Sequence, residues 1–191
     1  QAAQRIRNKL SLDWIAGAGE RAQAALIALP EFQAARVVAV YRARPREVGT
    51  DRVVAACRAA GKTVLLPAWI KAEAVYGLAR WDDGAPLRTG LYGIEEPANP
   101  QWVSGDEVDF IAVTALAFDR YGFRLGHGGG HFDRLLAGVR GTKACLAFEC
   151  QKLVATPTES HDVPVDVVVT EKAVYRAPAR LAFADPHELK K

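Results

Sequence analysis

The pattern of apolar and polar positions predicts a chain in which helices and strands alternate. Apolar side chains recur at helical spacing across residues 1–29, where we expect helical pieces that Gly17 and Gly19 separate and Pro30 ends. From residue 36 onward the chain changes to short β-branched and apolar runs, which are typical of buried strands. The runs expected to form strands are 36–41, 63–67, 74–81, 108–118, 144–148 and 165–171.

Two segments between these strands carry helix signals. Thr50 is placed to cap a helix over residues 51–60, which Gly61 would end, and another helix is expected near residues 131–139. Strands this apolar, alternating with helices, favour a mainly parallel sheet with both faces covered. We therefore expect a single three-layer α/β/α domain over residues 1–191, with a mainly parallel central sheet behind the N-terminal helical segment.

Composition and charge exclude several classes of function. Half of the residues are hydrophobic and a quarter are charged, with a formal net charge of only +3, so neither a nucleic acid nor a membrane is indicated as a partner. No apolar run approaches the length of a membrane span. The cysteines Cys57, Cys145 and Cys150 form no CxxC pair and favour a reducing, cytoplasmic compartment.

The stretch RLGHGGGHFDR at residues 124–134 carries the strongest chemical signal. It follows the most apolar predicted strand and opens a predicted helix, and its glycines can adopt positive φ. Successive amides in such a loop can curve around an anion, while Arg124 and Arg134 add positive charge. Phosphate binding is therefore the favoured hypothesis. The loop has no Gly-Lys-Ser/Thr of a P-loop, and His131 stands where a dinucleotide-binding motif has its third glycine.

Two other interpretations of the loop stay open. His127 and His131, with Asp133 and the His161–Asp162 pair, could form a zinc or iron site, although the intervening glycines do not fix the two loop histidines on a rigid helix. A tight strand-to-helix turn without a ligand is the third interpretation. Four glycines within residues 126–130 are more than such a turn needs, since each costs roughly 0.5–1 kcal/mol of backbone entropy relative to alanine.

Six segments, taken in order, resemble the 5-formyltetrahydrofolate cyclo-ligase family, also called methenyltetrahydrofolate synthetases. The glycine loop resembles that family's RLGxGxGYYDR sequence. The other five resemble its strand and loop with glutamate and threonine, its next strand, and its Gly-Ile-x-Glu-Pro, Ala-Phe-x-x-Gln and His-Asp-x-x-x-Asp stretches. They are VYRARPREVGT (40–50), GKTVLLP (61–67), GLYGIEEP (90–97), LAFECQ (146–151) and SHDVPVDVVVTE (160–171). Their order and rough spacing hold from about residue 36 to residue 176.

The resemblance implies the cyclo-ligase (NagB/RpiA/CoA-transferase-like) fold and an ATP- and magnesium-dependent ligase. Such an enzyme phosphorylates the formyl oxygen of 5-formyltetrahydrofolate. The neighbouring folate nitrogen then closes the ring, which gives 5,10-methenyltetrahydrofolate, ADP and phosphate. The expected partners are the reduced folate, ATP and Mg²⁺, bound by a monomer or weak homodimer.

The resemblance also assigns site residues. The nucleotide would contact Arg7 together with Arg124, Leu125, Gly126, His127, Gly128, Gly129, Gly130, His131, Phe132 and Asp133. Asp133 and Asp162 match positions that hold magnesium, an ion that prefers oxygen ligands. The folate would contact Arg42, Glu47, Tyr92, His131 and Phe132. A carboxylate such as Glu47 can accept two parallel N–H bonds from a pterin edge, and aromatic rings can wall the pterin by stacking.

Read without the resemblance, some of these residues have plainer roles. Glu47 would be an exposed loop charge beside Arg42, Arg44 and Arg46, and Arg7 would lie on a solvated helix face.

The chain departs from the family pattern at four places. Ala3 stands where a lysine is usual, Arg46 where glycine is frequent, Thr114–Ala115 where Pro-Gly is usual, and His131–Phe132 where two tyrosines are usual. Two further hypotheses follow: a diverged family member that binds folate or nucleotide without turnover, and a hydrolase with a histidine-bound metal.

Overall fold

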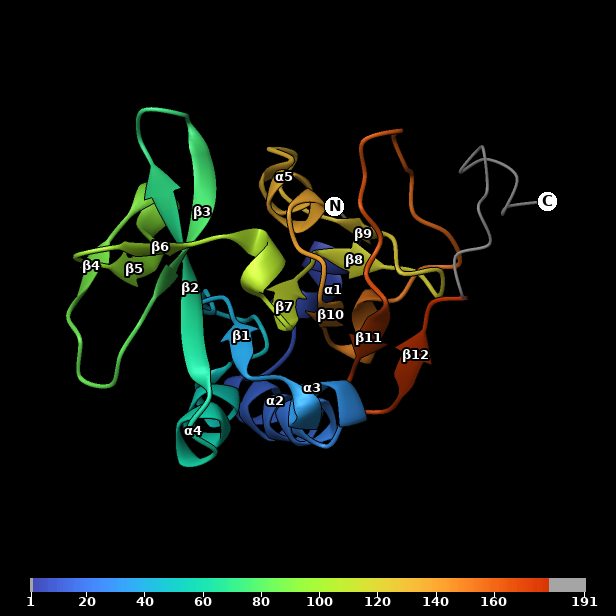
Figure 1. Ribbon diagram of the computed structural model, residues 1–191. Coiled ribbons are helices and arrows are strands. Elements are labelled where there is room, and N and C mark those ends of the chain that lie inside the picture. Colours follow the sequence, from blue (N-terminus) through green and yellow to red (C-terminus); the bar gives the residue numbers. More distant parts are fainter. Residues whose placement is uncertain (1, 179–191) are drawn as a thin grey trace.

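The computed structural model describes residues 2–178, with side chains from residue 5 onward, around a central sheet of eight strands (Figure 1). The strands are β1 (Val37–Ala39), β2 (Thr63–Ile70), β3 (Val75–Arg80), β6 (Gln101–Val103), β7 (Phe110–Thr114), β10 (Thr142–Leu146), β11 (Val167–Val169) and β12 (Val174–Arg176). Their spatial order is β12-β11-β10-β7-β1-β2-β3-β6. All neighbours from β11 to β2 are parallel, whereas β12, β3 and β6 pair antiparallel at the edges. The expected mainly parallel sheet is confirmed.

Helices cover both faces of the sheet because successive strand residues point to opposite sides. The helices are α1 (Ala2–Asn8), α2 (Leu12–Ile27), α3 (Pro30–Ala34), α4 (Asp51–Ala59) and α5 (His131–Ala137). Val38 and Phe110 belong to the core cluster that packs against α2, α3 and α4. Their neighbours Ala39 and Ile111 belong to a separate cluster that contains Leu136 of α5. In Figure 1, α2, α3 and α4 lie together below the sheet and α5 lies at the top.

Short hairpins and 3-10 turns join the main elements within the described residues. They are the paired strands β4 (Leu87–Thr89) and β5 (Glu95–Pro97), the paired strands β8 (Ala117–Phe118) and β9 (Arg124–Leu125), and the turns η1 (Leu91–Gly93), η2 (Gly105–Glu107) and η3 (Glu149–Gln151). The hairpin β4–β5, the strand β9, the turns and the edge strands β6 and β12 are too short for the sequence pattern to predict them.

The N-terminal helical segment breaks at a different place from the one its glycines predict. α2 runs without interruption through Gly17 and Gly19. The break falls before Leu12, where Ser11 Oγ accepts a hydrogen bond of 3.2 Å from the backbone N–H of Trp14. A glycine inside a helix costs about 1 kcal/mol relative to alanine, which packing can offset. Gly19 is buried on the face of α2 that packs toward α4, and this burial outweighs the low helix propensity.

The helix expected after Thr50 is present as α4, but its N-terminus is not capped by that residue. The Thr50 hydroxyl donates to the Tyr41 carbonyl at 2.7 Å instead. Gln23 of α2 supplies the cap, because its Oε1 accepts a 3.0 Å hydrogen bond from Arg52 N. Gly61 follows the end of α4 with a φ of 65°, so the expected glycine stop is confirmed.

The apolar run 108–118 forms two strands, β7 and β8, and not the one long strand expected. The chain turns between them at Ala115 and Leu116. Gln151 Nε2 donates to both carbonyls of this turn, at 2.6 Å and 3.2 Å. The turn carries the chain away from the sheet at the carboxyl end of β7.

The order of strands reverses between β1 and β7. From β1 the chain continues outward to β2, whereas β7 is followed by β10 and β11 on the other side. Parallel α/β sheets bind ligands in the crevice at the carboxyl ends of strands where such a reversal occurs. No helix within residues 2–178 has the length and hydropathy of a membrane span.

Candidate active site

A cleft of about 830 Å³ opens at this reversal. It is bounded by the segment after β1, the turn after β7, the glycine loop with the start of α5, and residues 157–162. The predicted site residues that line it are Arg42, Glu47, Tyr92, Arg124, Leu125, Gly126, His127, Gly128, Gly129, Gly130, His131, Phe132, Asp133 and Asp162. Arg7 does not line the cleft, although it lies near it. The fold therefore gathers into one cavity residues that are far apart in the sequence.

The glycine loop needs glycine for two different reasons. Gly128 and Gly130 have φ values of 91° and 60°, a region that side chains rarely adopt. Around Gly126 and Gly128 no heavy atom lies within 4 Å of an added Cβ, so the loop amides border open space. At Gly129 an added Cβ would lie 2.6 Å from Nε2 of His131. The loop is thus curved beside the cleft and closely covered by the His131 ring.

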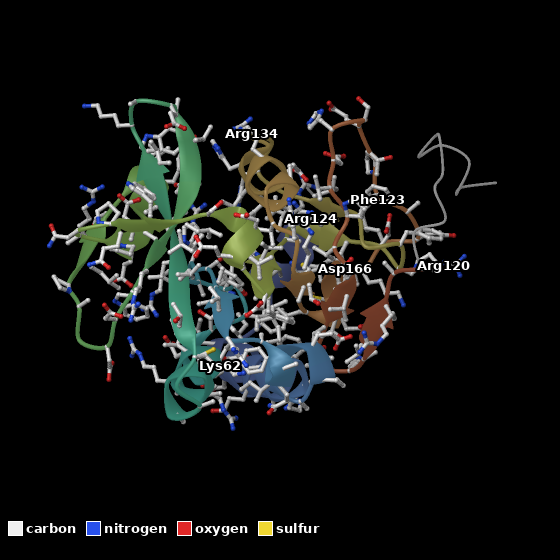
Figure 2. All side chains as sticks on the ribbon, in the orientation of Figure 1. Lys62, Arg120, Phe123, Arg124, Arg134 and Asp166 are labelled. Carbon is white, nitrogen blue, oxygen red and sulfur yellow. The ribbon has the colours of Figure 1, made fainter. Side chains whose placement is uncertain are left out.

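Arg124 and Asp133 form an ion pair with each other inside the protein. Arg124 Nη2 lies 2.9 Å from Asp133 Oδ1, and only 4% of the arginine side chain is exposed. Arg124 Nη1 donates to the Val163 carbonyl, and Val163 N donates to the same Asp133 oxygen at 3.1 Å. Figure 2 shows Arg124 in the interior, beneath α5. This network ties β9 and α5 to the segment that carries Asp162.

The two carboxylates assigned to magnesium line the same cleft. Asp162 Oδ2 accepts a hydrogen bond of 2.8 Å from Glu159 N, and its other oxygen lies 3.8 Å from His161 Nε2. Both of these partners of Asp133, Arg124 Nη2 and Val163 N, donate to its Oδ1. Magnesium needs few protein ligands because it keeps several waters. The donor set therefore fits the ion.

Glu47 is buried and not the exposed loop charge that its sequence context suggested. Its side chain is 8% exposed, and Oε2 accepts a hydrogen bond of 2.8 Å from Arg44 N. Burial raises the pKa of this carboxyl, and the charges of Arg7 and Arg44 together with the hydrogen bond oppose the rise. A carboxylate kept in such a place, against its own desolvation, is a candidate for ligand recognition.

Arg7 is also buried, contrary to the solvated helix face that the sequence alone favoured. It is 5% exposed, and its Nε and Nη1 atoms have no hydrogen-bond partner within residues 2–178. Its charge acts on Glu47 and on His127, so it lies near both of these cleft residues. The side chain of Ala3, where the family has a lysine, lies outside the described part.

The arginines near Glu47 in sequence have separate partners. Arg42 donates to Glu95 at 2.9 Å and to Asp51 at 2.9 Å, so much of its hydrogen-bonding capacity is used within the protein. Arg46 adopts a φ of 70°, the region that favours glycine, which accounts for the frequent glycine at this family position. A 2.7 Å hydrogen bond from Arg46 Nη1 to the Leu10 carbonyl helps to offset this strain.

An aromatic cluster surrounds His131 at the mouth of the cleft. Its ring centroid lies 5.7 Å from Trp69, 5.5 Å from Tyr76 and 5.8 Å from Tyr92. Tyr92 is 61% exposed and has a φ of 59°, so a strained residue is held over the cavity. Phe132 also lines the cleft, while packing against the core. These rings can wall a flat ligand on one side.

Sequence reasoning assigned no role in the site to several residues, among them Tyr76 and Trp69. Tyr76 lines the cleft beside His131, and Trp69 packs against Tyr76. Arg44, which the sequence indicated only as a charge near Glu47, also lines the cleft. Tyr76 and Trp69 face each other across the antiparallel pair β2–β3. Recognising the β2–β3 pairing from the sequence could have placed Trp69 and Tyr76 together. Their contact with His131 could not be predicted in this way, because His131 comes from a distant segment.

The described residues contain no group of three or more His, Cys, Asp or Glu side chains arranged to hold a metal ion. His131 packs among aromatic rings, and His161 is exposed beside Glu159. This arrangement does not support the histidine-bound metal.

Comparison with known proteins identifies the family. Residues 2–171 match the model of the 5-formyltetrahydrofolate cyclo-ligase family, and the chain belongs to this family. It is 33% identical over 148 residues to the 5-formyltetrahydrofolate cyclo-ligase of Haemophilus influenzae, which covers 74% of this chain and 79% of that protein. It is 34% identical over 145 residues to the enzyme of the same name from Mycolicibacterium smegmatis, covering 72% and 74%.

A solved structure agrees with this assignment. The NMR structure of 5,10-methenyltetrahydrofolate synthetase from Aquifex aeolicus superposes with a TM-score of 0.82 at 34% sequence identity, over 97% of this chain and 94% of that one. The fold expected from the resemblance, three layers around a mainly parallel sheet, is confirmed.

Proposed function

We propose that this chain catalyses the ATP-dependent conversion of 5-formyltetrahydrofolate to 5,10-methenyltetrahydrofolate, with release of ADP and phosphate. Family membership supports this activity. The structural observation that carries it is the meeting of two recognition elements in one cleft: the buried carboxylate of Glu47 and the curved glycine loop. The first suits adjacent N–H donors, and the second suits phosphate oxygens.

On this proposal the phosphates lie along the amides of Gly126–Gly130. Phosphoryl transfer requires donors and positive charge placed where negative charge develops. The loop supplies the donors, and Arg7 supplies a buried positive charge near Glu47. Arg124 is bound to Asp133, so its role is to hold the loop and α5 in position as well as to contribute charge.

The reduced folate then lies between Glu47 and the aromatic cluster. Glu47 accepts hydrogen bonds from the pterin's amino-pyrimidinone edge, while Tyr92, His131 and Phe132 cover its face. This placement directs the formyl oxygen toward the glycine loop. Once that oxygen is phosphorylated, the neighbouring folate nitrogen attacks the formyl carbon and phosphate leaves. The walls of the cleft hold both reactants at the distance that the transfer needs.

Mg²⁺ belongs to the proposal as the ion that Asp133 and Asp162 would hold. When bound, it would neutralise charge on the phosphates during transfer. The two side chains come from α5 and the 157–162 segment, which the Arg124 network joins.

The direct test of the proposed function is an absorbance assay for the methenyl product. We expect product to form only when ATP, a divalent ion and 5-formyltetrahydrofolate are all present, with one ADP released for each product molecule. Binding of both ligands without product would instead indicate the diverged, non-catalytic member. Turnover of another substrate with no response to 5-formyltetrahydrofolate would contradict the proposal.

The Asp133→Asn variant should need about tenfold more magnesium for half-maximal activity and should turn over more slowly, because an amide oxygen binds the ion more weakly than a carboxylate. Asparagine can still accept hydrogen bonds from Arg124 and Val163 N, so the fold should persist. The measurement is initial rate against magnesium concentration, with circular dichroism to verify folding.

The matched control is Asp106→Asn, which changes an exposed aspartate of η2 outside the cleft. Its magnesium dependence should equal that of the parent protein. If Asp133→Asn also leaves the magnesium dependence unchanged, or if the protein copurifies with stoichiometric zinc that activity requires, the metal assignment is wrong.

A further inference from the structure

Arg134 of α5 binds two groups of the site through one nitrogen. Its Nη2 atom lies 2.8 Å from the Gly129 carbonyl oxygen and 3.0 Å from His131 Nδ1. Figure 2 shows Arg134 on the side of α5 that faces β3. One side chain therefore holds both the end of the glycine loop and the ring that covers it.

These contacts decide which nitrogen of His131 carries the proton. A guanidinium has only donors and stays charged at every accessible pH. His131 Nδ1 must then be the acceptor in the 3.0 Å contact, which leaves the proton of the neutral ring on Nε2. Nε2 lies 3.5 Å from the Tyr92 hydroxyl, and both residues line the cleft.

The surroundings of His131 favour the neutral ring. Burial lowers its pKa, and the charge of Arg134 lowers it further. Among the described residues, the titratable or charged groups against the ring are Tyr76 from β3, Tyr92 from η1 and Arg134 from its own helix. Burial raises the pKa of Tyr76, so this phenol stays neutral and does not favour a protonated imidazole.

The Nε2–H tautomer of His131 can replace a hydrogen-bond donor that the family usually has at this position. The family pattern has a tyrosine there, whose hydroxyl can donate a hydrogen bond. An imidazole can replace that donor at Nε2 in only one of its two neutral forms. Glycine at position 129 allows the ring to pack closely on the loop, because an added Cβ would lie 2.6 Å from Nε2.

We propose that Arg134 is a positioning residue that fixes His131 as the Nε2–H tautomer, so that this N–H donates to an acceptor oxygen of the bound folate. The inference rests on the proposed function for the identity of the ligand. The tautomer itself rests on the contacts of Arg134 alone.

The first experiment measures the tautomer without any ligand. Histidine is labelled with ¹⁵N, and the His131 signals are assigned with the His131→Gln variant. We expect the parent protein to show a hydrogen-bearing Nε2 and a bare, pyridine-type Nδ1. In Arg134→Met, which keeps the length but removes every donor and the charge, the two nitrogens should show averaged shifts from both tautomers. A hydrogen-bearing Nδ1 in the parent protein overturns the inference.

The second experiment measures the consequence for the folate. Arg134→Met should raise the KM for 5-formyltetrahydrofolate about tenfold and the KM for ATP by a smaller factor. The ring loses both the contact that orients it and its fixed tautomer, and the tautomer alone accounts for about twofold. Arg134→Lys, which keeps the charge and one donor, should recover part of the loss. Arg140→Met removes an exposed arginine beyond the same helix and should match the parent.

A double-mutant cycle separates this role from a general structural one. The glutamine amide of His131→Gln can place a donor near the position of Nε2–H without depending on a tautomer. In that background Arg134→Met should have less than about twofold effect on the folate KM. If the full tenfold loss persists there, Arg134 does not act through His131 and the inference fails.

If 5-formyltetrahydrofolate neither binds nor turns over, the proposed function and the folate contact both fail, whereas a wrong tautomer with normal turnover overturns this inference alone.

Discussion

The Gly128→Val variant is expected to lose ATP binding while staying folded. Gly128 has a φ of 91°, a region from which a β-branched residue is strongly excluded. Its surroundings are open, with no heavy atom within 4 Å of an added Cβ, so the valine would fit sterically and change only the path of the backbone. That change rotates the loop amides away from the phosphates. Isothermal titration with ATP measures the loss, which should exceed about a hundredfold.

Gly84 offers a closely matched control. It has a φ of 73° in equally open space, but it lies in the turn between β3 and β4, outside the cleft. Gly84→Val should therefore carry similar backbone strain and bind ATP like the parent protein. If both variants bind ATP as tightly as the parent protein, the phosphates do not bind at the glycine loop. The loop would then be a tight turn without a ligand.

The Glu47→Gln variant is expected to discriminate between the two substrates. Glutamine keeps the size of the side chain, but one acceptor oxygen becomes a donor that faces the pterin's own N–H groups. An unmade buried hydrogen bond to a charged group costs on the order of 1–3 kcal/mol, which is a loss of roughly tenfold to a hundredfold in affinity. Binding of 5-formyltetrahydrofolate should fall by this factor, and binding of ATP should change by less than about twofold.

The stability of the same variant makes the result interpretable. Burial raises the pKa of Glu47 in the folded protein, so the ionised carboxyl is disfavoured there relative to the unfolded chain. The resulting loss in the free energy of unfolding is absent below the pKa that Glu47 has in the unfolded chain. It develops as pH rises through the higher pKa of Glu47 in the folded protein. Glu47→Gln removes it, while its amide oxygen can still accept from Arg44 N. The melting temperature at neutral pH should therefore stay equal or rise.

A control variant and two contradicting outcomes complete this test. Glu31→Gln alters a carboxylate that pairs with Arg176 away from the cleft, and it should leave both affinities unchanged. If Glu47→Gln weakens both ligands equally, Glu47 is a structural residue. If it weakens neither, the folate assignment loses its main support.

The strands of the central sheet could be predicted from the sequence because burial on both faces leaves a clear signal. Runs such as 165–171 and 63–67 consist mostly of β-branched and aliphatic residues. The edge strand β6 carries exposed Gln101 and Trp102 and has no such signal. The helix boundaries were predicted wrongly at Gly17 and Gly19 for another reason. Local helix propensity does not include the packing of α2 against α4.

The site could be predicted as a set of residues but not as a set of contacts. The positions of Glu47 and the glycine loop follow from the family resemblance and from strand ends. The ion pair between Arg124 and Asp133, and the burial of Arg7, depend on where distant segments meet. A short-range sequence pattern does not report contacts between distant segments. It placed Glu47 beside Arg42, Arg44 and Arg46, and it did not reveal the influence of Arg7.

The reversal of strand order between β1 and β7 gives the proposed enzyme a division of labour along its chain. Groups assigned to the folate come from the half that builds β1 to β6, through Glu47 and Tyr92, whereas groups assigned to the nucleotide and its ion come mostly from the half that builds β7 to β12. His131 crosses from the second half to the first, where it packs on β2 and β3. A change in the acceptor molecule can therefore arise from substitutions in the first half, with the phosphate-handling half inherited intact. His131, standing where the family has tyrosine, is the point at which the two halves must change together.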